Sequence, residues 1–427
     1  MTHAVLSSRT IAPGGCFSAS KMCSGSNAKV VSPRDSYVGS APVRAYFSNG
    51  LWRLPLELWC IIIEHLEGCD EALKACSSTC GAWRRPARQV FFRTMHVPQW
   101  PPKRPAEIPP RLRTLLAEQP EIAKLVRTMR VDLAFQELPW LSAFTNLRFL
   151  DLYLDGIHGR VPSESALDGL HLPHLTTLAV FLDVSPSLSS CERLMACCPH
   201  LTDLMMQGAP YGRIEEFAHI QVEEQPIATP LSLPRLRKVS FTAPGFERSF
   251  TKILRLAGDS LTCAHLATPL TPTLDLLRDM LDFSHNTHLE DLEIEMDAPI
   301  LEDGWGDYPA ALLSRINTSH SSLTRLYLSI PRFCLGLVSS TGRWAEVGQC
   351  LGRELSRVLD SMPHVTVVIL WLKFPIYVGQ EHSTVADCLL RQFPGLSAHS
   401  DRVCLHDPVH SAADDPDNHP LAHKTGL

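Results

Sequence analysis

The most regular feature of the chain is a short apolar pattern that recurs between about residues 121 and 400. Each copy has an apolar residue, two variable residues, an apolar residue, one variable residue and a last apolar residue. The last two positions are two apart, which places their side chains on one face of a β-strand. The pattern predicts nine strands, with apolar positions at Val126-Met129-Val131, Leu147-Leu150-Leu152, Leu175-Leu178-Val180, Leu201-Leu204-Met206, Leu236-Val239-Phe241, Leu261-Ala264-Leu266, Leu289-Leu292-Ile294, Leu323-Leu326-Leu328 and Val365-Val368-Leu370.

Helix-compatible segments lie between several of these copies, at Ser189–Cys197, Leu274–Phe283 and Glu346–Leu359. A proline stands two residues before the first apolar position in four copies, where it ends a preceding helix. One strand and one helix cannot bury their apolar faces alone, so neighbouring units must stack into a solenoid. The alternative is an ordinary α/β domain whose strands are rich in leucine.

The repeat resembles a degenerate leucine-rich repeat array. The segment Cys198-Pro199-His200-Leu201-Thr202-Asp203-Leu204 is most similar to the cysteine-containing subtype. Two features depart from that family: the spacing between copies is irregular, and the Asn or Cys expected after the strand is mostly missing.

Residues that alternate with the core positions are predicted to face the open side of the sheet. Aromatic residues and methionine at such positions are typical of protein interfaces, and three acidic residues would form a charged row. The predicted substrate-binding residues are Phe149, Tyr153, Phe181, Met205, Asp291, Glu293, Glu295 and Tyr327. If a loop or second layer covers the strands, the same residues are core instead. In the last copy Val367, Ile369 and Trp371 are all apolar, which weakens the exposed interpretation there.

A compact apolar block precedes the repeats at residues 51–97. Pro55 and Glu57 suit the first turn of a helix, and Leu58, Ile62 and Leu66 follow at helical spacing, with Ile61 widening the stripe. A second helix is expected to run from Leu73 through Cys80 to Trp83, followed by a third short element. The block carries more apolar surface than three short helices need. Either it binds a partner helix or it caps the first repeat.

The order of residues in this block resembles an F-box, and the match is close to fungal F-box proteins in which leucine-rich-like repeats follow the box. Leu54-Pro55-x-Glu57-Leu58 is followed by Ile61-Ile62-Ile63, His65-Leu66, and Leu73-x-x-Cys76-Ser77-x-x-Cys80-x-x-Trp83-Arg84. Gly81 and Ala82 depart from the family, which usually has a larger or basic residue there.

The resemblance implies docking on the Skp-family adaptor of a cullin–RING (SCF-type) ubiquitin ligase, while the repeats hold an unknown protein substrate. The adaptor-binding residues it implies are Leu54, Pro55, Glu57, Leu58, Ile61, Ile62, Leu66, Cys80 and Trp83, with Leu54 and Pro55 foremost. Cys76 and Trp83 are equally compatible with internal packing. A repeat scaffold that acts outside any ligase is the alternative.

Composition limits the remaining choices. The chain has 33 prolines in 427 residues, which excludes one long helix, and its net charge of −6 argues against a nucleic-acid partner. No apolar run reaches the length of a membrane span, and the 14 cysteines lie within apolar patterns, as expected of reduced thiols in a cytoplasmic or nuclear protein.

The expected fold class is α/β, with a short all-helical F-box module followed by a leucine-rich-repeat-like α/β solenoid. The expected boundaries are a disordered Ser-rich leader at 1–50, the module at 51–97, a Pro/Arg-rich connector with at most one short helix at 98–120, the solenoid at 121–400 and a disordered tail at 401–427. The leader faintly resembles an organelle transit peptide, but its basic residues are sparse.

Motifs for catalysis are not found. The chain has no Gly-rich phosphate loop, no Gly-x-Ser-x-Gly and no His-Glu-x-x-His. The best metal candidate is a zinc site at Cys191, Cys197, Cys198 and His200, but buried thiols are the favoured interpretation. The tail pairs His406/His410 and His419/His423 are attributed to a solvated tail. We therefore expect no enzymatic activity, no cofactor and no metal.

Overall fold

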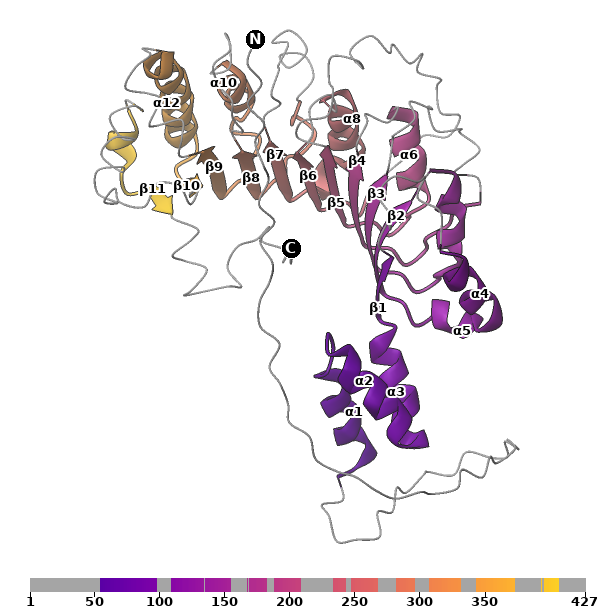
Figure 1. Cartoon of the computed structure of the whole chain (residues 1–427). Coiled ribbons are helices and arrows are strands. Elements are labelled where there is room, and N and C mark those ends of the chain that lie inside the picture. The colour runs from indigo at the N-terminus through magenta and orange to yellow at the C-terminus, as the bar shows by residue number, and fades with distance from the viewer. Residues whose placement is uncertain are drawn as a thin grey trace, which may run out of the picture. The chain divides into compact units, whose positions relative to one another are not determined.

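The computed structural model of the chain describes residues 54–97, 109–133, 135–154, 167, 169–182, 188–208, 233–242, 247–267, 282–295, 307–331, 343–372, 393 and 395–406. The protein is α/β. Its strands form one parallel sheet of eleven strands, in which each strand is hydrogen-bonded to the strands before and after it in the chain (Figure 1). The predicted α/β class is therefore confirmed.

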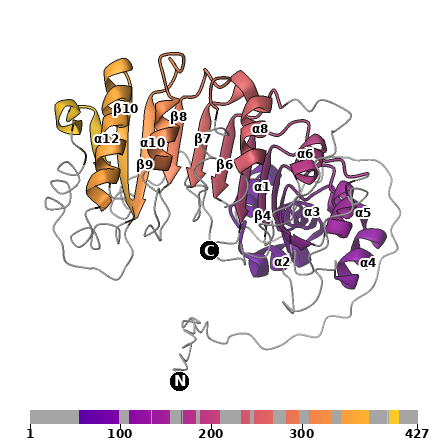
Figure 2. The same ribbon diagram turned by 90° about the horizontal axis from the view of Figure 1, so that it is seen from above.

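The sheet is built from short strands of four to seven residues. They are β1 (Thr94–Val97), β2 (Thr128–Leu133), β3 (Phe149–Leu154), β4 (Thr177–Leu182), β5 (Asp203–Gly208), β6 (Lys238–Thr242), β7 (Cys263–Ala267), β8 (Asp291–Glu295), β9 (Arg325–Pro331), β10 (Thr366–Leu372) and β11 (Val403–His406). The helices α6 (Leu188–Ala196), α8 (Glu247–Ala257), α10 (Asp307–Ser314) and α12 (Arg343–Ser361) lie along the same side of this sheet (Figures 1 and 2).

The leading apolar position of each predicted copy lies in the core. All nine of these side chains, from Val126 to Val365, are at most 2% exposed. The backbone just before each strand joins the copies in a repeating step: the N–H groups of Arg148 and Phe149 both donate to the Arg127 carbonyl, at 2.8 and 3.0 Å. The same pair of bonds links Thr176 and its successor to Arg148 at 2.9 Å each. One pattern of residues thus generates one pattern of hydrogen bonds.

All nine predicted strands exist, as β2 to β10, and two further strands flank them. The strand β1 lies within the block expected to be entirely helical, and β11 lies within the expected tail, so both boundaries were wrong by a few residues. Each flanking strand has only four residues, too few to show the apolar pattern. Residues 1–53 and 407–427, which include the predicted leader and most of the predicted tail, lie outside the described residues.

The last predicted copy is out of phase by one residue. In β10 the buried side chains are Val367 and Ile369, which are at most 1% exposed, whereas Val368 is half-buried. The register explains this, because Val367 pairs with Leu326 and Ile369 with Leu328, which are core positions of β9. Val367 and Ile369 are therefore core, and the predicted Val365-Val368-Leu370 core is wrong at Val368, whereas the Leu370 side chain lies outside the described set.

Three helices precede the sheet: α1 (Leu56–Glu64), α2 (Asp70–Thr79) and α3 (Gly81–Phe91). They enclose a small core of Ile63, Leu73, Ala87 and Val90. The expected second helix does not continue to Trp83, because the chain is extended at Cys80 (φ −154°, ψ 160°).

Local chemistry accounts for that break. The hydroxyls of Ser77, Ser78 and Thr79 all donate to carbonyls of the preceding turn, at 2.7 to 2.9 Å. Such side-chain bonds compete with helix propagation, and Gly81 has a low helix propensity.

The connector contains one helix, α4 (Pro110–Glu118), and the short α5 (Pro120–Ala123) begins at its last residue; each has proline in its first turn. The predicted interstrand helices at 189–197 and 346–359 correspond to α6 and α12, whereas residues 274–281 lie outside the described part of the chain. Within the described residues, none of the helices has both the length and the apolar character needed to cross a bilayer.

Candidate functional site

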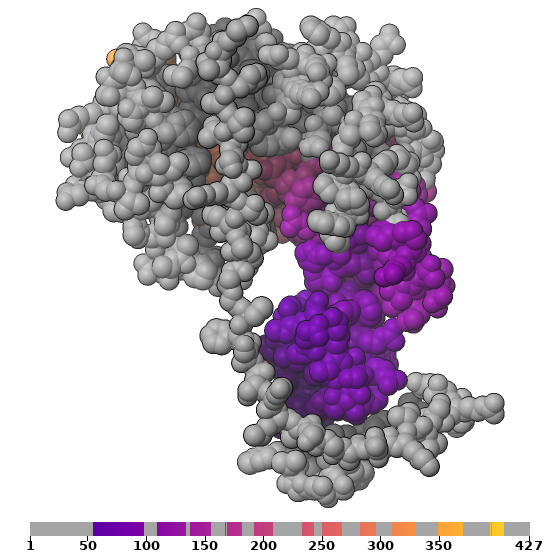
Figure 3. Space-filling model, in the orientation of Figure 1, coloured from indigo at the N-terminus to yellow at the C-terminus, as the bar shows by residue number. Residues whose placement is uncertain are grey.

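The helix α1 carries an exposed apolar face. Within the described part of the chain, the large apolar side chains that stand exposed are Leu54, Leu56, Leu58, Ile61 and Ile62, between 37% and 49% accessible. The one fully buried side chain of the helix is Ile63, which is 1% exposed. This module forms the indigo part of the surface in Figure 3. A helix with more apolar residues outside than inside is unusual for an isolated unit and typical of a binding face.

The nine predicted adaptor-binding residues divide into two groups. Six are exposed on or just before α1: Leu54, Pro55, Glu57, Leu58, Ile61 and Ile62. Leu66, Cys80 and Trp83 are half-buried. Leu66 and Trp83 pack against the module's own core, and Trp83 also contacts Trp59, with ring centroids 4.5 Å apart. The structure thus brings the first six together on one surface and gives Leu66 and Trp83 packing contacts within the module.

A row of polar side chains crosses the sheet face at β6, β7 and β8. The Ser240 hydroxyl lies 2.8 Å from His265 Nδ1, and His265 Nε2 lies 3.2 Å from a Glu295 oxygen. Burial alone lowers the pKa of His265, but the hydrogen bond to Glu295 and the charges of Glu293 and Glu295 outweigh it, so the pKa is raised. Sequence reasoning placed Ser240 and His265 on this face without assigning them a role.

The predicted acidic row does not form an open set of free carboxylates. Asp291 and Glu293 are each 8% exposed. Arg325 donates to both oxygens of Asp291 at 2.6 Å, and Ser329 donates to Glu293 at 3.0 Å. Arg325 and Ser329, both on the neighbouring strand β9, therefore satisfy Asp291 and Glu293 within the sheet.

The Ser240–His265–Glu295 row has the residue types of a hydrolase triad but not its geometry. Ser240 is 6% exposed and sits within a regular strand, whose N–H groups belong to the parallel ladder. An acyl-transfer site needs unpaired N–H donors aimed at the developing oxyanion, beside a reachable nucleophile. We assign this row a structural role, because its hydrogen bonds link the side chains of β6, β7 and β8.

Aromatic candidates gather on β3 and β4. Tyr153 and Phe181 stack with ring centroids 4.3 Å apart and planes 5° apart, and both are half-buried. Arg130 of β2 donates to the Tyr153 hydroxyl at 2.6 Å. Burial raises the pKa of neighbouring Asp151, against the lowering effect of Arg130 and His96. Of the remaining predicted residues, Phe149, Met205 and Tyr327 are half-buried, and the Trp371 side chain is outside the described set.

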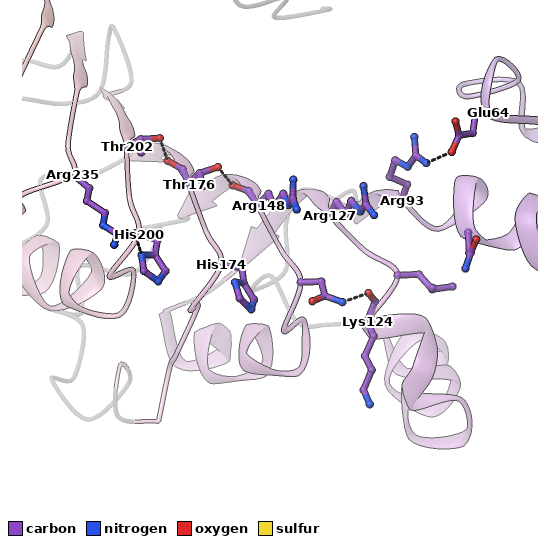
Figure 4. Close-up of a pocket in the computed structure, with 13 residues that line it drawn as sticks. Glu64, Arg93, Lys124, Arg127, Arg148, His174, Thr176, His200, Thr202 and Arg235 are labelled. Carbon is purple, nitrogen blue, oxygen red and sulfur yellow. Dashed lines mark hydrogen bonds and ion pairs between the residues drawn. The ribbon is translucent and has the colours of Figure 1, made fainter. Parts of the chain in front are cut away.

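A hollow of about 720 Å³ follows the edge of the sheet where the strands begin (Figure 4). One row of its lining residues stands immediately before successive strands, namely Arg93, Arg127, Arg148, Thr176 and Thr202; Lys124, His174, His200 and Arg235 lie beside them. Sequence reasoning missed this site. The sequence does contain a signal for it: in most copies the residue that follows the leading apolar position is arginine or threonine.

The zinc candidate does not assemble from its described members. Cys197 and Cys198 donate to the carbonyls of Arg193 and Leu194, at 3.1 and 3.4 Å, and burial raises the pKa of both thiols. The ring of His200 is held by Arg235. Among the described residues, no group of three or more potential metal ligands lies together, and the Cys191 side chain is outside that set.

Comparison with known proteins adds no assignment: no family model and no curated protein matches the chain.

Proposed function

We propose that this chain is a substrate-recognition subunit of an SCF-type cullin–RING ubiquitin ligase. In this proposal residues 54–92 form an F-box that docks on a Skp-family adaptor, and the strands and helices that follow form a leucine-rich-repeat-like solenoid that holds a protein substrate. The observation that carries the proposal is the exposed apolar face of α1, because four of its five members, Leu54, Leu58, Ile61 and Ile62, are residues of the F-box motif.

The size of this face suits a docking role. Full burial of one exposed Leu or Ile side chain contributes about 1.5–3 kcal/mol. These five side chains are 37–49% exposed, so burial of their exposed parts contributes roughly 3–7 kcal/mol toward docking, before the cost of association. Pro55 starts α1, because the Pro55 carbonyl accepts the N–H groups of Leu58 and Trp59 at 3.1 and 3.2 Å. Leu54 precedes this proline and is exposed.

The stepwise order of the strands supports the solenoid. Each strand pairs with its immediate successor in the chain, and helices occupy one side of the sheet, as expected when repeated strand–helix units stack (Figure 2).

The test is co-purification of the full chain with a Skp-family adaptor. The double substitution Leu58→Asp/Ile61→Asp places two carboxylates on the exposed face, and we expect adaptor affinity to fall by about a hundredfold or more. Ala75→Asp adds a carboxylate on an exposed site of α2 and should bind normally. Circular dichroism confirms that each variant is folded. If the unmodified chain fails to bind the adaptor, or the double variant binds equally well, the assignment is wrong.

A further inference from the structure

The hollow at the strand beginnings is strongly basic. Arg93, Arg127, Arg148, Arg235 and Lys124 contribute five cations, and Glu64 is the one carboxylate among the described lining residues. This contrasts with the chain as a whole, whose net charge is −6. A local field opposite in sign to that of the whole protein concentrates anions at this edge.

Several of the cations are available to a ligand. Arg127, Arg148 and Lys124 are exposed, and no carboxylate among the described residues pairs with them. Arg93 differs, because it pairs with Glu64 at 3.4 Å and with Glu67 at 3.2 Å.

The backbone fixes the spacing of this row. Arg127 accepts two N–H bonds from the next strand, and its own N–H donates to the Arg93 carbonyl at 2.9 Å. The guanidinium groups of Arg93, Arg127 and Arg148 therefore start from adjacent strands, about 4.8 Å apart. Figure 4 shows them in line, with His174, His200 and Arg235 continuing alongside.

We propose that this edge, from β1 to β6, binds an extended acidic peptide segment of a partner protein through repeated Asp or Glu side chains. Five strand spacings give about 24 Å, which matches about seven residues of extended chain at about 3.3 Å each. Guanidinium groups recognise carboxylates with charge-assisted, often bidentate hydrogen bonds.

The lining favours a peptide over a single-stranded nucleic acid. Proteins that bind single strands stack the bases on aromatic side chains, and the lining has no Phe, Tyr or Trp among the described residues. The lining contains none of the proposed adaptor-binding residues and none of the candidate residues on the sheet face, so the test of this site does not require the proposed ligase role.

Direct binding to the full chain tests the proposal. The probe is a fluorescent peptide with a run of about seven Glu and Asp residues, and the comparison peptide has Gln and Asn in their place. We expect the acidic peptide to bind, to lose about tenfold or more in affinity with Arg127→Glu/Arg148→Glu, and to weaken as salt is raised. Arg353→Glu reverses an exposed charge on α12, outside the hollow, and should leave binding unchanged.

Three results would overturn the proposal: no binding of the acidic peptide at low salt, equal binding by the double variant, or tighter binding of an oligonucleotide with the same number of charges. Because both arginines are exposed, the double variant should fold, and its melting temperature checks this. Adaptor binding by the same variant should be normal, which separates this site from the proposed F-box.

Discussion

His265 is a titratable residue within the polar row of the sheet. It lies between Ser240 on β6 and the carboxylates of Glu293 and Glu295 on β8. Its pKa is raised above 6.5, because the interactions with the two glutamates exceed the opposing cost of burial. A group with a raised folded-state pKa stabilises the fold in its protonated form.

That contribution is complete below the unfolded-state pKa and is lost as the pH rises through the folded-state pKa. We therefore expect the melting temperature of the unmodified chain to fall between about pH 6 and pH 8 more than that of His265→Gln. The exposed His174 serves as the control, since His174→Gln should keep the trend of the unmodified chain. Thermal unfolding followed by circular dichroism measures both. A pH dependence that His265→Gln leaves intact would assign the effect to other groups.

At the scale of elements, side chains from one unit satisfy the helix ends of the unit before it. The carbonyls of the last turn of a helix have no partner within that helix. Asn286 donates to the carbonyls of Leu254 and Gly258, at 3.0 and 2.9 Å, at the end of α8. Arg357 donates to the carbonyls of Leu313 and Ile316 at the end of α10, and Arg402 donates to those of Leu359 and Met362 at the end of α12. These bonds couple neighbouring units independently of the sheet.

Removing Asn286 should therefore uncouple two units. Asn286 is fully buried, and Asn286→Ala leaves two carbonyls of α8 and its following turn without that donor. We expect a loss of about 1–3 kcal/mol in the free energy of unfolding, measured by urea denaturation. Thr287→Ala, which removes a bond to Asp259 nearer the surface, should cost less. Equal losses for the two variants would mean that the helix-end bonds are not the main contribution.

The strands could be predicted because burial imposes a repeated apolar spacing, and β2 to β9 retain it. The residues of β10 that face the core could not be predicted, because Val365 to Leu372 is apolar at nearly every position. Either set of alternating residues in this segment fits the apolar pattern. The roles of Asn286 and Arg357 as donors to the end of the preceding helix could not be predicted either. Their partners lie 28 to 44 residues away and differ in residue type from unit to unit.

The two candidate surfaces also differ in whether their residues are close together in the sequence. The exposed face of α1 was predicted through a motif, since its residues are close in sequence. The basic edge depends on residues from six separate segments that only the parallel register brings into line.

In the whole molecule, the three-helix module and the sheet have separate hydrophobic cores. Ile63, Leu73, Ala87 and Val90 form one, and the side chains of the sheet and its helices form the other. The two are joined through the chain at Phe92, which packs on the larger core, and through polar contacts such as Arg88 with Gln119 at 2.7 Å. Exposed ion pairs of the kind that Arg93 makes contribute about 1 kcal/mol or less.

This separation predicts the effect of removing the module. Deletion of residues 54–91 keeps Phe92, β1 and the rest of the sheet, so we expect one cooperative unfolding transition with a melting temperature lowered by about 4 °C or less. Adaptor binding should be abolished, and binding of the acidic peptide should remain. A module that instead serves as the cap of a scaffold would seal the first strands. Its deletion would then broaden or abolish the transition, as differential scanning calorimetry would show, and would favour the scaffold over the ligase subunit.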